Sequence, residues 1–297
     1  MAWRAVVRVL RSPLDSVTSV VIPGDCRVCQ SPLPLLTRVP VCASCWSDLP
    51  SQSSSLCSRC GEDLAVADFG ETPSEGILCR QCRLAPPPFE MAVAHGTYQG
   101  TLRSLLHLLK YEGLEPIARR LAALIAERVT RIPELPRTML VIPVPLFKAR
   151  QSERGFNQAE LLVGGVIRAM RQLRPEWEGE FAPGVLARQR ATQSQAGLSL
   201  TERRRNLRGA FFVAQPERLR GREVLLIDDI YTTGATARAC SQALRRAGAA
   251  GIWVATVARA QRRQIEAFHP SAAAEGPMHE DVAIWDGGKP QVAESKH

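Results

Sequence analysis

Two adjacent carboxylates stand at the end of an apolar run, beside a turn rich in threonine and glycine. The stretch Val224–Thr236 reads VLLIDDIYTTGAT, so that four apolar residues lead into Asp228 and Asp229 and a helical pattern follows. The apolar run predicts a buried, central, parallel strand over Glu223–Ile230. Ligands of open α/β sheets bind at the carboxyl ends of the strands, so this strand would deliver both acids to a binding site.

The turn after the acids has the features of an anion cradle. Backbone N–H groups at a helix N-terminus, three hydroxyls and a glycine that permits close approach suit a phosphate. We assign this role to Thr232, Thr233, Gly234, Ala235 and Thr236. The chain has no Walker A motif, and carboxylates do not bind phosphate, so the acids must face hydroxyls or a divalent cation. Phosphoribosyl pyrophosphate with Mg²⁺ fits these demands. The alternative, a structural strand-to-helix turn, accounts for a threonine and a glycine but not for two acids.

Eight of the nine cysteines form four C-x-x-C pairs within 57 residues. Twelve residues separate the first two pairs and eighteen separate the last two, which is typical of zinc ribbons. Two such turns supply four thiolates to one tetrahedral ion. The spacing therefore predicts two structural zinc ions, with sequential or interleaved pairing both open. The predicted ligands are Cys26, Cys29, Cys42, Cys45, Cys57, Cys60, Cys79 and Cys82.

Two other uses of paired cysteines are less consistent with the chain. Disulfides need an oxidising compartment, and the N-terminus does not resemble a secretory signal because Arg4, Arg8 and Arg11 interrupt its apolar part. A redox C-x-x-C usually occurs once, at a strand–helix junction. The ninth cysteine, Cys240, lies in a predicted helix and is interpreted as a small core residue.

The patterns around these motifs predict an α/β domain with a mainly parallel sheet behind a small cysteine module. Strand patterns (91–98, 139–146, 184–188, 206–213, 223–230 and 251–259) alternate with helical ones (101–111, 115–129, 155–173 and 234–247). A proline linker, LAPPPFE, marks the boundary between the two parts. We expect an N-terminal amphipathic helix (1–22), a double zinc ribbon (23–85), the α/β domain (86–268) and a mostly disordered tail (269–297).

The charge balance favours polyanionic partners. The 297 residues carry a formal net charge of +9, while a hydrophobic content of 45% indicates a globular chain. One arginine-rich segment, 186–208, carries a single acid, Glu202, among polar amides, whereas a solubilising face would mix lysine and glutamate. We interpret it as a contact for nucleic-acid phosphates or a ligand, with a solvated face as the alternative. The arginines are Arg188, Arg190, Arg203, Arg204, Arg205 and Arg208.

The residues from Val224 to Thr236 resemble the phosphoribosyl-pyrophosphate signature of type I phosphoribosyltransferases. The resemblance implies that Asp228 and Asp229 take the catalytic, ribose-binding role and that the turn holds the 5′-phosphate. Together with four C-x-x-C pairs, the stretches VIPVPLFKARQSERGFNQAELL and LARQRATQSQAGLSLTERRRNLRGAF are similar to the ComF family, from about Cys26 to Arg259. That family combines a double zinc ribbon with a type I phosphoribosyltransferase-like domain. In it, Arg150 and Arg154 stand where transferases place the pyrophosphate loop.

The ComF resemblance implies a function in natural transformation. A ComF-like protein would bind phosphoribosyl pyrophosphate or a nucleotide and handle single-stranded DNA during uptake, with a DNA-uptake helicase and the inner-membrane DNA channel as further partners. We expect it in the cytoplasm, with peripheral contact at the inner membrane as the alternative. Two other functions stay open: an active phosphoribosyltransferase in nucleobase or metabolite salvage, and a zinc-ribbon adaptor with a vestigial domain.

Overall fold

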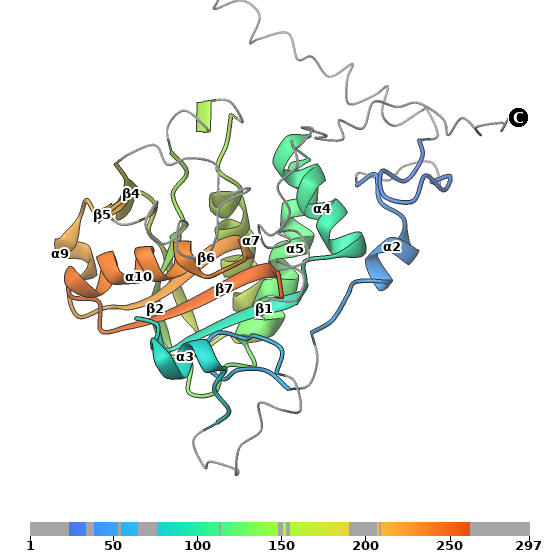
Figure 1. The fold of residues 1–297 in the computed structure, drawn as a ribbon. Helices are drawn as coiled ribbons and strands as arrows, with labels where there is room; N and C mark the ends of the chain where they lie inside the picture. The colour runs from blue at the N-terminus through green and yellow to red at the C-terminus, as the bar shows by residue number, and fades with distance from the viewer. Residues whose placement is uncertain are drawn as a thin grey trace, which may run out of the picture.

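A computed structural model shows an α/β domain with two cysteine modules packed against it (Figure 1). The N-terminal helix and the C-terminal tail expected from the sequence lie outside the described residues. Those residues are 24–33, 39–52, 55–64, 76–112, 114–147, 151–152, 155–189, 207 and 209–261.

One five-stranded sheet forms the centre of the domain, in the order β1-β7-β6-β2-β3, and every neighbouring pair is parallel. β7 is almost wholly buried and β6 is buried from Val224 to Ile227, which explains the continuous apolar sequence of these stretches. The parallel α/β sheet expected from the sequence is confirmed. The strands are β1 (Met91–Thr97), β2 (Thr138–Pro143), β3 (Glu178–Phe181), β6 (Glu223–Tyr231) and β7 (Gly251–Arg259).

Helices cover both faces of this sheet. The helices α4 (Gly100–Tyr111), α5 (Glu115–Val129) and α7 (Gln158–Leu173) pack on one face with the apolar side chains of one core. The helix α10 (Ala235–Arg246) lies on the other face, over a second core. Beside α10, β4 (Leu186–Arg188) and β5 (Phe211–Val213) form a separate antiparallel pair, and α9 (Pro216–Leu219) leads into β6.

The two cysteine modules pack on opposite faces of the sheet. The first contains the short helix α2 (Ala43–Ser47), and its Cys26, Cys45 and Trp46 belong to the core beneath α4 and α5. The second contains α3 (Arg80–Leu84), and its four cysteines belong to the core beneath α10. In Figure 1 the two helices accordingly lie on different sides of the domain.

The order of the strands places a topological switch point between β2 and β6. From β2 the chain passes through α7 to β3 on one side, whereas from β6 it passes through α10 to β7 on the other. The connections therefore diverge at the carboxyl ends of β2 and β6 and leave a crevice there, which is where ligands of open α/β sheets bind.

Candidate functional site

The switch point holds the acid pair and the turn that the sequence singled out. A small pocket there is lined by Val144, which follows β2, and by Asp228, Thr232, Gly234 and Thr236 from β6 and the start of α10. Thr256 of β7 closes its base, opposite Asp228 in the strand register. The strand-end site predicted from the sequence thus has a physical counterpart.

The two aspartates point to opposite faces of the sheet, because successive side chains of a strand alternate. Asp228 lines the pocket on the α10 face. Asp229 instead reaches the α4 face, where its Oδ2 lies 2.7 Å from Nζ of Lys110. The backbone N–H of Asp229 donates to Oδ1 of Asp228 at 2.9 Å, which orients the first carboxyl toward the pocket.

Lys110 is a site residue that the sequence interpretation did not assign. Its side chain is 19% exposed and that of Asp229 is 14% exposed, so water screens the pair only partly. Burial alone would lower the pKa of Lys110, but the charge and hydrogen bond of Asp229 outweigh it and raise that pKa. A sequence signal existed, because Lys110 stands four residues after the buried Leu106 and so falls on the apolar face of its helix.

The environment of Asp228 favours its neutral form. Burial, followed by the negative charge of Asp229, raises its pKa to about 8. Below a pH of about 8 Asp228 therefore keeps its proton, while Asp229 forms the ion pair with Lys110. A protonated carboxyl can donate a hydrogen bond to a hydroxyl oxygen, and an ionised one can only accept. Asp228 thus offers a hydrogen-bond donor inside the pocket, while Asp229 offers an acceptor on the α4 side of the strand end.

The turn between β6 and α10 is shaped by Gly234. This residue is the N-cap of α10 and has a φ of 75°, in the left-handed region that glycine adopts readily. A Cβ at this position would lie 2.2 Å from the hydroxyl of Tyr231, so the turn rests directly on the tyrosine. Thr233 Oγ1 accepts from the N–H of Ala235 at 3.3 Å. The first turn of α10 contains no acidic residue, so its positive end faces the pocket uncompensated.

The segment after β2 lies along the other side of the crevice. Asn157 caps α7 by accepting from the N–H of Ala159 at 3.0 Å, and its Nδ2 donates to the carbonyl of Val144 at 3.2 Å. The helix expected over 155–173 thus begins after Asn157. Arg150 and Arg154, assigned to the pyrophosphate loop, lie outside the described residues, and their role stays a prediction.

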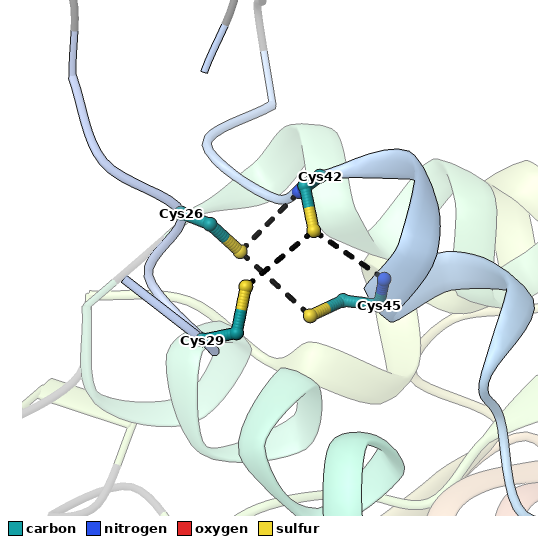
Figure 2. A group of neighbouring side chains, drawn as sticks. All are labelled: Cys26, Cys29, Cys42 and Cys45. Carbon is teal, nitrogen blue, oxygen red and sulfur yellow. Dashed lines mark hydrogen bonds between the residues drawn. The ribbon is translucent and has the colours of Figure 1, made fainter. Parts of the chain in front are cut away.

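The eight paired cysteines form two groups of four, each from two sequential C-x-x-C motifs. Within each group all sulfur atoms lie within 4.8 Å of one another, and the pairing that the sequence left open is therefore sequential. Figure 2 shows the first group, in which four sulfur atoms converge on a common centre. The groups are Cys26, Cys29, Cys42 and Cys45, and then Cys57, Cys60, Cys79 and Cys82.

The distances between sulfur atoms fit a tetrahedral zinc ion. With Zn–S bonds of about 2.3 Å, the edges of a tetrahedron measure about 3.8 Å. The sulfur atoms of Cys26 and Cys45 are 3.8 Å apart, and those of Cys60 and Cys79 are 3.7 Å apart. In each module a helix begins directly after a cysteine, Cys42 or Cys79, whose sulfur accepts an N–H from three residues on. Both groups thus fit structural zinc with four protein ligands and no open position.

Only one of the predicted contact arginines is described. Arg188 ends β4, with its guanidinium carbon 5.4 Å from the ring centre of Phe211. The other five lie outside the described residues, and nucleic-acid contact by this segment stays a prediction. None of the helices among the described residues is long and apolar enough to cross a membrane.

A parallel sheet with an acid pair and a threonine–glycine turn at its switch point, joined to two four-cysteine modules, defines the class of protein. It is a type I phosphoribosyltransferase-like domain combined with a double zinc ribbon. A model of the double zinc ribbon domain matches residues 17–83.

Curated relatives give the family. The DNA utilization protein YhgH of Escherichia coli O157:H7 is 35% identical over 239 residues, 78% of this chain and 96% of that protein. Competence protein F of Haemophilus influenzae is 32% identical over 228 residues, 74% and 96% of the two chains. Competence protein ComFC of Bacillus subtilis is 26% identical over 71% of this chain and 80% of that protein. The chain belongs to the ComF family.

Solved structures give a weaker likeness. The allosteric regulatory enzyme of purine biosynthesis matches with a TM-score of 0.31 and 19% identity over 48% of this chain, and the match spans 26% of that structure's chain.

Proposed function

We propose that this protein binds the ribose 5-phosphate end of phosphoribosyl pyrophosphate or of a nucleotide at the switch point, and handles single-stranded DNA during uptake. The observation that carries the first part is the turn at Gly234, where a left-handed glycine, an uncompensated helix N-terminus and an acid with a raised pKa surround one pocket. The names of the curated relatives, which refer to DNA utilization and competence, support the second part.

In the proposed complex the phosphate lies against the N–H groups and hydroxyls that begin α10. Asp228 donates to one ribose hydroxyl from within the pocket. Asp229 points to the α4 face, so in the complex its side chain leaves Lys110 and turns across the end of the strand to accept from the other hydroxyl. The freed ammonium group of Lys110 then faces the diphosphate. Because one acid is protonated and the other is already paired, Mg²⁺ would be held mainly by the ligand's own diphosphate oxygens.

Calorimetric titration tests this proposal in two separate arms. Phosphoribosyl pyrophosphate with Mg²⁺ should bind the full chain, and Asp229→Asn should weaken that binding. Single-stranded oligonucleotides should bind with little sequence preference and with an affinity that falls as salt rises. Failure of the first arm would reject the ribose-phosphate site, and failure of the second would reject DNA contact.

An active phosphoribosyltransferase is the second candidate. The observation that favours it is the intact acid pair, because a site that had lost its chemistry would have no need of a carboxyl with a raised pKa next to an ion-paired one. Release of pyrophosphate when phosphoribosyl pyrophosphate is offered with a panel of nucleobases would distinguish this function from simple binding.

A further inference from the structure

Arg259, at the end of β7, joins the second cysteine module to the turn at the switch point. Its side chain is 4% exposed. The guanidinium donates through Nη2 to the sulfur of Cys60 at 3.7 Å and to the carboxylate of Glu62. Its carbon lies 4.3 Å from the ring centre of Tyr231, the residue opposite it in the register of β6 and β7. One buried cation therefore contacts both a predicted zinc ligand and the last residue of the acid-bearing strand.

Tyr231 lies between Arg259 and the turn at Gly234. The residue is 6% exposed, and its ring packs edge-on against Phe89, with ring centres 6.5 Å apart. The turn lies so close that a Cβ on Gly234 would meet the hydroxyl at 2.2 Å and the ring at 2.5 Å. A shift of the ring must therefore move the turn, because the packing leaves no gap between them.

Few other groups compensate the positive charge of the buried Arg259 guanidinium. Its Nε and Nη1 are buried with no hydrogen-bond acceptor among the described residues. Zinc with four thiolates has a net charge of −2, so a loaded second module attracts Arg259 strongly across a short distance.

Two further hydrogen bonds hold the second module to the α/β domain. The N–H of Asp63 donates to the side chain of Gln261 at 3.1 Å, and the N–H of Ala92 in β1 donates to the carbonyl of Arg59 at 2.8 Å. The first module packs into the core on the other face of the sheet. Its polar contacts with the domain include Arg27 with Glu112 and the ring of Trp46 beneath Arg120, and among the described residues none of its polar contacts reaches the turn at Gly234.

We propose that Arg259 is a positioning residue through which zinc in the second module, and not in the first, sets the anion-binding conformation of the turn. The inference rests on the proposed function, since it regulates the same site. The coupling is reciprocal by thermodynamic necessity: if zinc strengthens ligand binding, the ligand strengthens zinc binding by the same factor. Bound phosphoribosyl pyrophosphate should therefore increase the affinity for one zinc ion and leave the other unchanged, and we expect the higher affinity to appear as slower release.

The test follows zinc release from the full chain into a chromophoric chelator, with and without saturating phosphoribosyl pyrophosphate and Mg²⁺. The first module should release its ion first, because its ligand Cys29 is exposed while all four ligands of the second module are buried. In the unmodified protein the ligand should slow only the later phase, by about tenfold for a coupling of ordinary size. The double variant Arg259→Met, Glu62→Gln removes the coupling residue without leaving a buried unpaired carboxylate, and it should abolish the slowing. Arg120→Met, which removes an arginine from an aromatic ring of the other module, should keep it.

A second variant keeps the test decisive if the double variant fails to fold. Tyr231→Leu keeps the contacts of Arg259 with Cys60 and Glu62, so it should retain two zinc ions while losing the effect of the ligand on their release. Slowing that persists in both variants, or that affects the two phases equally, would overturn the inference.

Amide hydrogen exchange separates this inference from the proposed function. If the unmodified protein binds no phosphoribosyl pyrophosphate, the proposed function fails by itself. The coupling is then read from exchange at residues 232–236 before and after the second zinc ion is removed. Faster exchange there, absent when only the first ion is lost, supports the positioning role. Unchanged exchange overturns it.

Discussion

The protonated state of Asp228 has a measurable consequence for stability, and Asp228→Asn tests it. An acid whose native pKa is raised binds its proton more tightly when folded than when unfolded. Its contribution to stability is complete below the unfolded pKa of about 4 and is lost as the pH rises through the native value of about 8. Asparagine has no such titration, and its amide oxygen can still accept from the N–H of Asp229. The variant should therefore gain stability relative to the unmodified protein as the pH rises.

The magnitude follows from the linkage slope of about 1.4 kcal/mol per pH unit between the two pKa values. The slope flattens near pH 8, so the difference in the free energy of unfolding should grow by about 2 to 3 kcal/mol between pH 6 and pH 9. Measurements start at pH 6 because zinc thiolates take up protons at lower pH. Most of the increase should appear below pH 8, and little should appear above it.

Urea denaturation followed by circular dichroism at four pH values supplies the free energies by linear extrapolation. Asp229→Asn is the control, because it replaces the neighbouring carboxyl in the same way. Unlike Asp228→Asn, it leaves the ammonium group of Lys110 without its ion-pair partner. We expect it to destabilise the protein by about 2 kcal/mol, between the values for exposed and for fully buried pairs. A difference between Asp228→Asn and the unmodified protein that stays constant from pH 6 to pH 9 would refute a protonated Asp228.

Three further predictions concern the metal, the turn and the arginines. Elemental analysis should find about two zinc equivalents per chain, and a chelator should remove them in two phases because Cys29 of the first group is exposed while all four cysteines of the second are buried. Gly234→Val should abolish calorimetric binding of phosphoribosyl pyrophosphate with two zinc ions retained, since its side chain would collide with Tyr231; unchanged affinity would show the turn to be vestigial. The last variant replaces Arg203, Arg204 and Arg205 by alanine. It should weaken the binding of all single-stranded oligonucleotides alike and flatten the slope of log K against log salt by up to about two units. An unchanged slope would indicate that these arginines form a solvated face.

The parts of the fold that sequence predicted best are those in which neighbouring residues determine the structure. The apolar run before Asp228 could only be a buried strand, and the helical pattern after Gly234 could only return along its face. The cysteine spacings likewise predicted four-sulfur sites, because two C-x-x-C turns supply one tetrahedron whichever way they pair. In these segments the structure that the local sequence pattern favours is also the one that the tertiary fold requires.

The parts that sequence could not predict depend on contacts between distant segments. The edge strand β3, with the sequence EGEF, is mostly exposed and has no apolar run, so no strand pattern marked it. The ion pair of Lys110 with Asp229 joins residues more than a hundred positions apart. The contact of Arg259 with Cys60 joins residues 199 positions apart. It depends on the order of the strands in the sheet, which local sequence patterns do not predict.

The position of the two modules indicates why a single chain carries both. Between them the chain crosses the edge of β1, where Ser51 bridges to Gly96 and the N–H of Thr97 donates to the carbonyl of Pro50 at 3.2 Å. The approach is so close that a Cβ on Gly96 would lie 2.0 Å from that carbonyl, which explains a glycine within a strand. An exposed edge of this kind would otherwise present unpaired N–H and C=O groups to other chains. Because one module is anchored on each face, the crossing segment is held at both ends. It therefore covers part of the edge of β1, the outer strand of the sheet that carries the site.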